Sequence, residues 1–104
     1  MAEEVIWSEN AEEDLQNALR HLSENWIVRE CEYFLDQITT TLNYVISFPE
    51  GSPRVKGRTI RERFVRPYHL MIYDISDNIV RVLALFDCRQ DPKKRIEILK
   101  KIRG

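Results

Sequence analysis

The chain has 104 residues, of which 43% are hydrophobic and 32% are charged, and its formal net charge is -1. These values are typical of a globular protein rather than a disordered one, and the length predicts one domain over residues 1–104. No apolar run approaches the roughly 20 residues of a membrane span, and the start MAEEV lacks the features of a secretory signal. We therefore expect a cytoplasmic protein whose cysteines, Cys31 and Cys88, are free thiols.

The small net charge conceals an uneven distribution along the chain. Residues 1–52 hold 2 Lys and Arg against 11 Asp and Glu, whereas residues 53–104 hold 14 against 6. Such an asymmetry favours a face that meets an anionic partner, although acidic helices that complement the basic half within the fold would give the same counts. The two cysteines and two histidines match no zinc signature, so we expect neither a metal nor a cofactor.

The first half of the chain predicts a short strand and two helices. Val5, Ile6 and Trp7 favour an extended segment over residues 4–7. Ser8 is a good N-cap for a helix that ends near Asn25. Its apolar stripe consists of Ala11, Leu15, Ala18, Leu19 and Leu22.

A second helix is predicted from about Ile27 to Ser47. Its longer apolar stripe consists of Ile27, Cys31, Phe34, Leu35, Ile38, Leu42, Val45 and Ile46. The short link predicts an antiparallel helical hairpin, and Trp7 and Trp26 are interpreted as packing residues at the ends of the first helix. Thr39, Thr40 and Thr41 should lie mostly off the stripe.

After a Pro- and Gly-containing loop over residues 48–53, three antiparallel strands are predicted within residues 59–86. In the first strand, Ile60, Glu62 and Phe64 should face one way, and Arg61, Arg63 and Val65 the other. Asp77 and Asn78 tolerate the positive φ of a tight turn between the last two strands.

Both faces of the last two predicted strands are apolar at their centres. The helical hairpin can cover one face of this sheet, and either the C-terminal helix or a partner chain covers the other. Asp91 and Pro92 mark the start of that helix. The predicted fold class is therefore α+β.

Several motifs, taken with the order of these elements, resemble the RelE/ParE superfamily of toxins from type II toxin–antitoxin modules. The motifs are WSENAEEDL at Trp7–Leu15, the Phe48-Pro49 loop with Gly57 downstream, the strand pair around Pro67-Tyr68 and Ile72-Tyr73, and LFDCRQDPKK at Leu85–Lys94. The resemblance covers nearly the whole chain. It implies a β-α-α-β-β-β domain in which the helical hairpin packs on an antiparallel sheet, followed by a short C-terminal helix.

The resemblance also implies a biological role. Members inhibit growth when free, contribute to plasmid stabilization, and are neutralised by a cognate antitoxin in a hetero-oligomer. RelE-like members cut mRNA in the ribosomal A site, whereas ParE-like members poison DNA gyrase and have no known hydrolytic role. We expect the free toxin to be poorly soluble, because an antitoxin segment would cover its apolar surface.

The catalytic set of RelE-like members matches this chain only in part. Arg61 and Arg63 match the two basic residues of the first strand of the trio, and Arg89 matches the arginine at the end of the last strand. The arginine of the middle strand falls on Leu70, and the C-terminal tyrosine falls near Arg95.

Metal-free phosphodiester cleavage needs a base, an acid and cations on the developing charge. Leu70 supplies none of these, and although the neighbouring His69 titrates near neutrality, a packing role is the alternative for this lone histidine. These departures favour ParE-like gyrase inhibition. The alternative is a metal-independent ribonuclease that uses Arg61, Arg63, His69 and Arg89, and a third hypothesis is a decayed module that only binds its antitoxin.

The basic residues also predict a surface for the cellular target, which is either gyrase or the ribosome with its mRNA. Arg61, Arg63 and Arg89 would grip phosphates, and the alternative is a solvated strand face. The border of this surface would include Arg66, Arg81, Lys93 and Lys94. For Tyr68 and Tyr73, base stacking competes with packing in the core.

Overall fold

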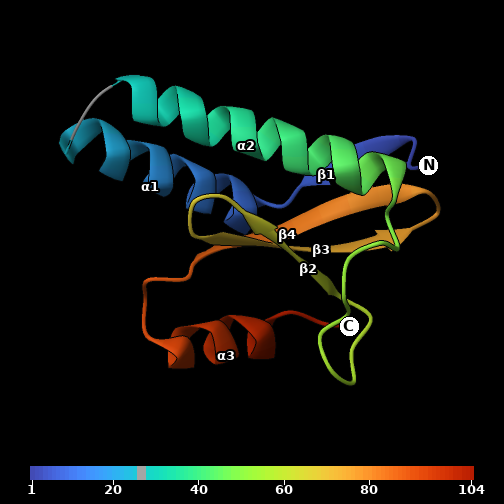
Figure 1. The fold of residues 1–104 in the computed structure, drawn as a ribbon. Helices are drawn as coiled ribbons and strands as arrows, with labels where there is room; N and C mark the ends of the chain where they lie inside the picture. Colours follow the sequence, from blue (N-terminus) through green and yellow to red (C-terminus); the bar gives the residue numbers. More distant parts are fainter. Residues whose placement is uncertain (26–27) are drawn as a thin grey trace.

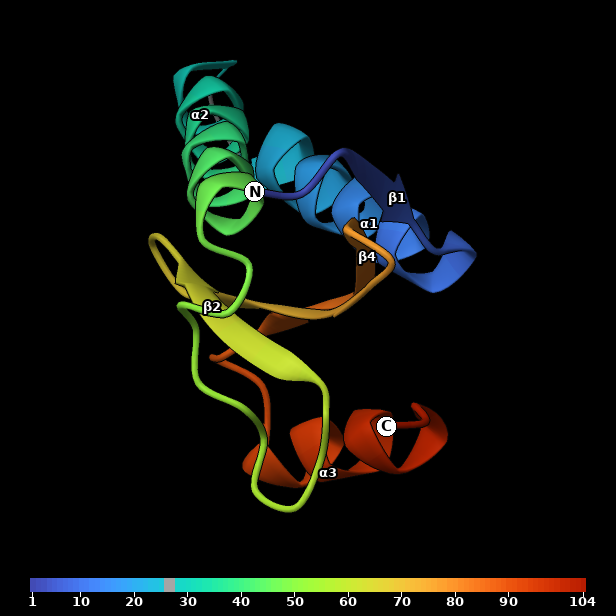
Figure 2. The ribbon, with the colours of Figure 1, turned by 90° about the vertical axis from the view of Figure 1, so that its right-hand side faces the viewer.

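The computed structural model describes residues 1–25 and 28–104 and arranges them in three layers (Figure 1, Figure 2). A helical hairpin covers one face of a four-stranded sheet, and a short C-terminal helix covers the other. The elements are β1 (Glu4–Trp7), α1 (Glu9–Asn25), α2 (Val28–Ser47), β2 (Arg61–Val65), β3 (His69–Ser76), β4 (Ile79–Asp87) and α3 (Pro92–Lys101). The predicted element order is confirmed, whereas the expectations for Trp26 and Ile27 fall on residues outside the described part.

The strands lie in the order β1-β4-β3-β2. β2, β3 and β4 form the predicted antiparallel trio, but β1 runs parallel to β4 in the register Glu4↔Ile79 to Trp7↔Val82. The sheet is therefore mixed rather than wholly antiparallel. A parallel pair needs a long crossover connection, and here the two helices, β2 and β3 together provide it.

Local chemistry explains where the elements begin and turn. Asp77 and Asn78 adopt φ of 53° and 61°, which is the backbone of a tight hairpin turn with two left-handed central residues. The Ala11 N–H donates to Ser8 Oγ at 3.1 Å, so Ser8 caps α1 as predicted. Asp91 caps α3 in the same way by accepting from the Lys93 N–H at 3.0 Å.

Two apolar cores lie on opposite faces of the sheet. The larger core joins the helical hairpin to β2, β3 and β4, and its members include Phe34, Ile38, Val45, Val65, Met71, Tyr73, Val80, Val82 and Leu85. The smaller core lies under α3 and contains Ile60, Ile72, Ala84 and Leu99. Ile60 and Val65 thus lie on opposite faces, as the alternation predicted. The C-terminal helix α3 covers this second face, which was one of the two predicted alternatives.

The buried stripe of α2 is narrower than the sequence predicted. It consists of Phe34, Ile38, Thr41 and Val45, whereas Leu35 is 42% exposed. Thr41 enters the stripe because its hydroxyl donates to the Gln37 carbonyl oxygen at 2.8 Å, which satisfies the buried polar group. Among the described residues, no helix has the length and apolar character needed to cross a bilayer.

Polar contacts fasten α3 to the loop that precedes β2. The Arg58 guanidinium donates to the carbonyl oxygens of Leu99 and Ile102, at the end of α3. The Thr59 N–H donates to the Gly104 carbonyl oxygen at 2.6 Å. Near the other end of α3, Arg95 Nε donates to Glu62 of β2 at 2.8 Å. These bonds supplement a core too small to hold the helix firmly by itself.

Ser8, the cap of α1, and a side chain of α1 satisfy the part of the β4 edge that β1 leaves unpaired. The backbone N–H of Ser8 donates to the Val82 carbonyl oxygen at 2.9 Å, and its hydroxyl donates to the Leu83 carbonyl oxygen at 3.2 Å. Further along, the Leu85 N–H donates to Asp14 Oδ2 at 3.0 Å. The Asp14 side chain of α1 therefore satisfies a backbone N–H of β4 beyond the end of β1.

Candidate functional site

Arg61 and Arg63 project from β2 toward the end of α2, on the same face of the strand. The Arg63 guanidinium carbon lies 3.7 Å from the centroid of the Tyr44 ring, a cation–π contact with α2. Arg61 Nη1 donates to the carbonyl oxygens of Glu50 at 3.2 Å and Ser52 at 2.7 Å. Both guanidinium groups are therefore engaged by neighbouring parts of the chain.

Tyr73 lies fully buried beside these two arginines. Its hydroxyl donates to the Pro49 carbonyl oxygen at 2.9 Å. Burial raises the pKa of Tyr73, and the positive charges of Arg61 and Arg63 oppose that rise. This neutral phenol anchors the loop after α2, so Tyr73 has the core role that was one of its two predicted roles.

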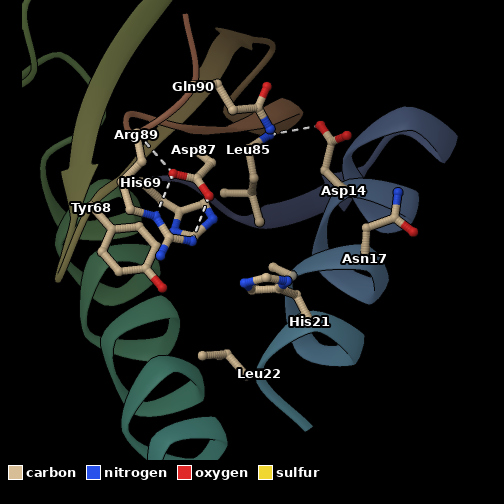
Figure 3. A pocket seen from close by; sticks show the side chains of 11 residues that line it. Asp14, Asn17, His21, Leu22, Tyr68, His69, Leu85, Asp87, Arg89 and Gln90 are labelled. Atoms are coloured by element: carbon tan, nitrogen blue, oxygen red, sulfur yellow. Dashed lines mark hydrogen bonds and ion pairs between the residues drawn. The ribbon is translucent and has the colours of Figure 1, made fainter. Parts of the chain in front are cut away.

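Arg89 lies at the far end of β4 in a second cluster (Figure 3). Its Nη2 lies 2.8 Å from Asp87 Oδ2 and its Nε lies 3.1 Å from Oδ1, so the ion pair is two-pronged. The guanidinium carbon also lies 3.7 Å from the centroid of the Tyr68 ring. Partial burial acts to raise the pKa of Asp87, but the hydrogen bonds and charge of Arg89 hold it below its ordinary value.

His69 belongs to this second cluster and is 6% exposed. Its ring centroid lies 4.8 Å from that of Phe34 and 5.1 Å from that of Tyr68. Burial lowers the pKa of His69, with Asp87 opposing the change and Arg89 adding to it. Among the residues that the structure describes, the buried His69 Nδ1 has no hydrogen-bond partner. The imidazole is therefore neutral and packed between aromatic rings.

A cavity of about 330 Å³ opens beside the Asp87–Arg89 pair. Figure 3 shows that side chains of α1 form its opposite wall. These are Asp14, Asn17, Ala18, His21 and Leu22. Burial raises the pKa of Asp14, although the Leu85 N–H opposes the rise. Among the described residues, no group of three or more His, Cys, Asp or Glu is placed to hold a metal ion.

The structure does not bring the predicted catalytic residues together. Arg61 and Arg63 contact the loop after α2 and Tyr44, whereas His69 and Arg89 lie in the second cluster with Asp87 and Tyr68. Leu70 is half-buried on β3 and paired in register with Phe64. Arg95, near the position of the family's tyrosine, is bound to Glu62.

Of the other predicted binding residues, Arg66 lines a cavity together with Arg63 and Leu70, whereas Arg81, Lys93 and Lys94 lie elsewhere. Arg66 is exposed in the β2–β3 turn. Arg81 lies near the opposite end of the sheet, where it is paired in register with Asp74 and donates to Ser76 Oγ. Lys93 and Lys94 are exposed on the first turn of α3. The predicted phosphate-gripping patch is therefore not one surface.

A second, more apolar cavity of about 450 Å³ adjoins the first. Leu22 and Tyr68 line both cavities, and the apolar one is otherwise lined by Arg29, Glu30, Tyr33, Phe34 and Pro67. Tyr33 is 45% exposed and Val28 is 72% exposed at this end of α2. We call this cavity the hairpin groove. The sequence did not predict this groove or the role of Asp14, although exposed apolar residues outside the α2 stripe are the signal for such a groove.

Comparisons with known proteins agree with the fold. Residues 5–92 match the family model described as the ParE toxin of the type II toxin–antitoxin system parDE. A solved structure described as the chromosomal ParDE toxin–antitoxin system from P. aeruginosa contains a chain of similar fold, with a TM-score of 0.68 and 9% sequence identity. The similarity covers 81% of this chain and 94% of that one. No curated protein matches the sequence.

Proposed function

Because the chain belongs to the family of ParE toxins of type II toxin–antitoxin systems, we propose that it inhibits DNA gyrase by binding and that a cognate antitoxin neutralises it. The inhibition requires no hydrolysis by the toxin itself. The chain's own contribution is a rigid sheet that presents a surface to gyrase, with no reacting group to assemble.

The observation that carries this proposal is the separation of the RelE-like catalytic set. Cleavage of RNA would require an acid, a base and free cations around one phosphate. Here Arg63 is stacked on Tyr44, Arg89 is paired with Asp87, and His69 is buried in its neutral form. The half-buried Leu70 adds no polar group. This arrangement supports a binding protein over the ribonuclease.

The test is to express the toxin without its antitoxin and to measure DNA supercoiling and protein synthesis separately. Purified toxin should inhibit supercoiling of plasmid DNA by gyrase, while translation in a cell-free extract continues and its mRNA stays intact. The variant Arg63→Ala should also leave the mRNA intact. Arrested translation with cleaved mRNA and unaffected gyrase would instead establish the ribonuclease.

We further propose that an apolar segment of the antitoxin occupies the hairpin groove. Tyr33, Pro67 and Tyr68 offer it an apolar lining, and Arg29 and Glu30 stand at the rim. A helical or extended peptide that buries such a groove gains the free energy of removing this apolar surface from water. This cover also accounts for the low solubility expected of the free toxin.

The antitoxin proposal has a matched pair of variants. Tyr33→Asp places a charge in the hairpin groove, whereas Leu35→Asp alters a side chain of similar exposure that does not line it. Tyr33→Asp should weaken binding of the antitoxin encoded beside the toxin gene by at least about tenfold, measured by calorimetry. Leu35→Asp should leave the affinity nearly unchanged. Equal effects of the two variants would place the antitoxin elsewhere.

A further inference from the structure

We propose that the layer formed by α3 and the loop that supports it binds the phosphate backbone of duplex DNA. We call this surface the α3 face and define it as residues 53–59 and 92–104. The proposal rests on the proposed function, because gyrase acts on DNA and a toxin bound to gyrase would meet the same duplex.

The α3 face carries a high density of exposed positive charge. The exposed cations are Arg54, Lys56, Lys93, Lys94, Lys100, Lys101 and Arg103. The α3 face also carries the exposed carboxylate of Glu97, and the exposed Asp91, immediately before this face, is engaged as the cap of α3. A cluster of one sign at this density creates a potential that attracts a polyanion and raises its rate of encounter.

The fold does not neutralise these charges. Two ion pairs join described residues, Arg89–Asp87 and Arg95–Glu62, and all four partners lie in the basic half of the chain. The acidic residues of α1 and α2 therefore do not complement the basic half through ion pairs among the described residues. Of the two explanations for the uneven sequence, this observation favours a face for an anionic partner.

Internal contacts join the two segments of the α3 face. Arg58 and Thr59 bind the end of α3, which brings the loop carrying Arg54 and Lys56 beside the chain terminus (Figure 2). Lysine pairs lie at both ends of a ten-residue helix. Such a helix is about 15 Å long, which is the length of about four base pairs of B-DNA.

The composition of the α3 face fits a phosphate backbone better than an acidic protein. Protein interfaces have an apolar core and are depleted of lysine. Among the large apolar side chains of α3, Ile96 is strongly exposed, with an exposed fraction of 50%. Lysines act as mobile point charges that contact phosphates without reading sequence, so the binding should be independent of DNA sequence.

The position of the acidic residues favours one orientation of the toxin relative to the DNA duplex. The exposed carboxylates Glu9, Glu12 and Glu13 lie on α1, and Glu30 and Glu32 lie on α2. The sheet separates both helices from α3 (Figure 1). A duplex is therefore attracted by one side of the molecule and repelled by the other.

The test measures the binding of free toxin to a fluorescently labelled 20-base-pair duplex by anisotropy. The wild type should bind duplexes of unrelated sequence equally. The logarithm of its association constant should fall with the logarithm of salt concentration with a slope of about −4, as expected for four to five phosphate contacts. Reversing four charges, by Lys93→Glu, Lys94→Glu, Lys100→Glu and Lys101→Glu together, should lower the affinity at least tenfold.

Matched single variants control for general effects of charge. Lys100→Glu changes the α3 face, whereas Arg20→Glu makes the same change of net charge on α1. Lys100→Glu should weaken binding severalfold and Arg20→Glu less than twofold, with circular dichroism confirming that both fold. Equal effects of the two variants would overturn the proposal, as would polyglutamate of equal charge competing as well as DNA, which would point to an acidic protein.

Gyrase inhibition distinguishes failure of this inference from failure of the proposed function. If the wild type inhibits gyrase but the fourfold variant binds DNA as tightly as the wild type, this inference is overturned, while the proposed function stands. If the wild type binds DNA through the α3 face but does not inhibit gyrase, the surface is established and the proposed function fails.

Discussion

The two helical layers differ in both packing and charge. The hairpin layer is joined to the sheet by a large apolar core and has an acidic surface, whereas the α3 layer has a small core, polar fastenings and a basic surface. Burial therefore provides the stability of one layer, while directional hydrogen bonds hold the other in place. The sheet between them allows two oppositely charged surfaces to coexist in 104 residues.

The largest expected effect tests the difference in packing. Phe34→Ala should lower the free energy of unfolding by about 4 kcal/mol, because it empties the centre of the larger core. Leu99→Ala should cost only about 2 kcal/mol, because the small core under α3 relaxes more easily around the lost side chain. Urea denaturation measures both values, with Leu35→Ala as a control that should change stability little. A larger effect for Leu99→Ala would reverse the comparison.

A second prediction concerns the polar fastening of α3. Arg58→Ala removes charged hydrogen bonds to two carbonyl oxygens and should cost about 2 kcal/mol. The effect should be local, with faster amide exchange in α3 and unchanged exchange in α1. Arg54→Ala, at an exposed position in the same loop, should change stability by less than about 0.5 kcal/mol. Uniform acceleration throughout the chain would show that α3 is not a separate unit.

On the hairpin side, Asp14 offers a smaller test of polar contacts. Asp14→Ala leaves the Leu85 N–H without its acceptor and should cost about 1.5 kcal/mol. Asp14→Asn keeps an acceptor oxygen and removes a carboxylate whose pKa is raised by burial, so it should be close to neutral. Thermal unfolding at pH 7 compares the two variants. Equal losses would show that the charge, rather than the hydrogen bond, matters at this edge.

The smallest expected effect is a pH dependence that originates from His69. Burial lowers its pKa, so the unfolded chain binds a proton near pH 6.5 while the folded chain resists it. The stabilisation is therefore fully present above pH 6.5 and is lost as the pH falls through the folded pKa. The slope for one proton is at most about 1.4 kcal/mol per pH unit.

The variant His69→Phe isolates this contribution by removing the titrating group and keeping an aromatic ring between Phe34 and Tyr68. Denaturation between pH 7.5 and 5 should be less dependent on pH in the variant than in the wild type. The carboxylate of Asp87 interferes little, because the folded state lowers its pKa and its contribution to stability is lost only as the pH falls below about 5. An unchanged pH profile would mean that His69 binds protons equally in both states.

The sequence predicted the elements because their signals are local. Ser8, Asp77 and Asp91 act through backbone groups within three residues, so the caps and the turn could be assigned without a fold. The parallel pairing of β1 was not predicted, because no local pattern records which distant strand a short segment joins. Thr41 is buried and Leu35 is exposed, which is the reverse of what the sequence predicted. The side chains of α2 that are buried depend on how the helix packs against the sheet, which the sequence of the helix alone does not record.

The site was less predictable than the fold for a related reason. The alternation of β2 correctly placed Arg61 and Arg63 on one face, but a residue pattern does not reveal whether a guanidinium is free. Arg61 is engaged by carbonyl oxygens of a loop nine or more residues away, and Arg63 by a ring on α2. Lys93 and Lys94 were predicted only as part of the border of a surface, yet they are exposed, whereas Arg61, Arg63 and Arg81 are half-buried.

The pairing of β1 with β4 also has a consequence for synthesis of the toxin. Ser8 and Leu83, which close this pairing through a hydrogen bond, are 75 residues apart in the chain. During translation, β1 cannot pair with β4 until nearly the entire polypeptide has emerged from the ribosome, because a contact between distant segments forms only when both segments are available. The sheet is consequently completed only at the end of translation, after β4 has left the ribosome.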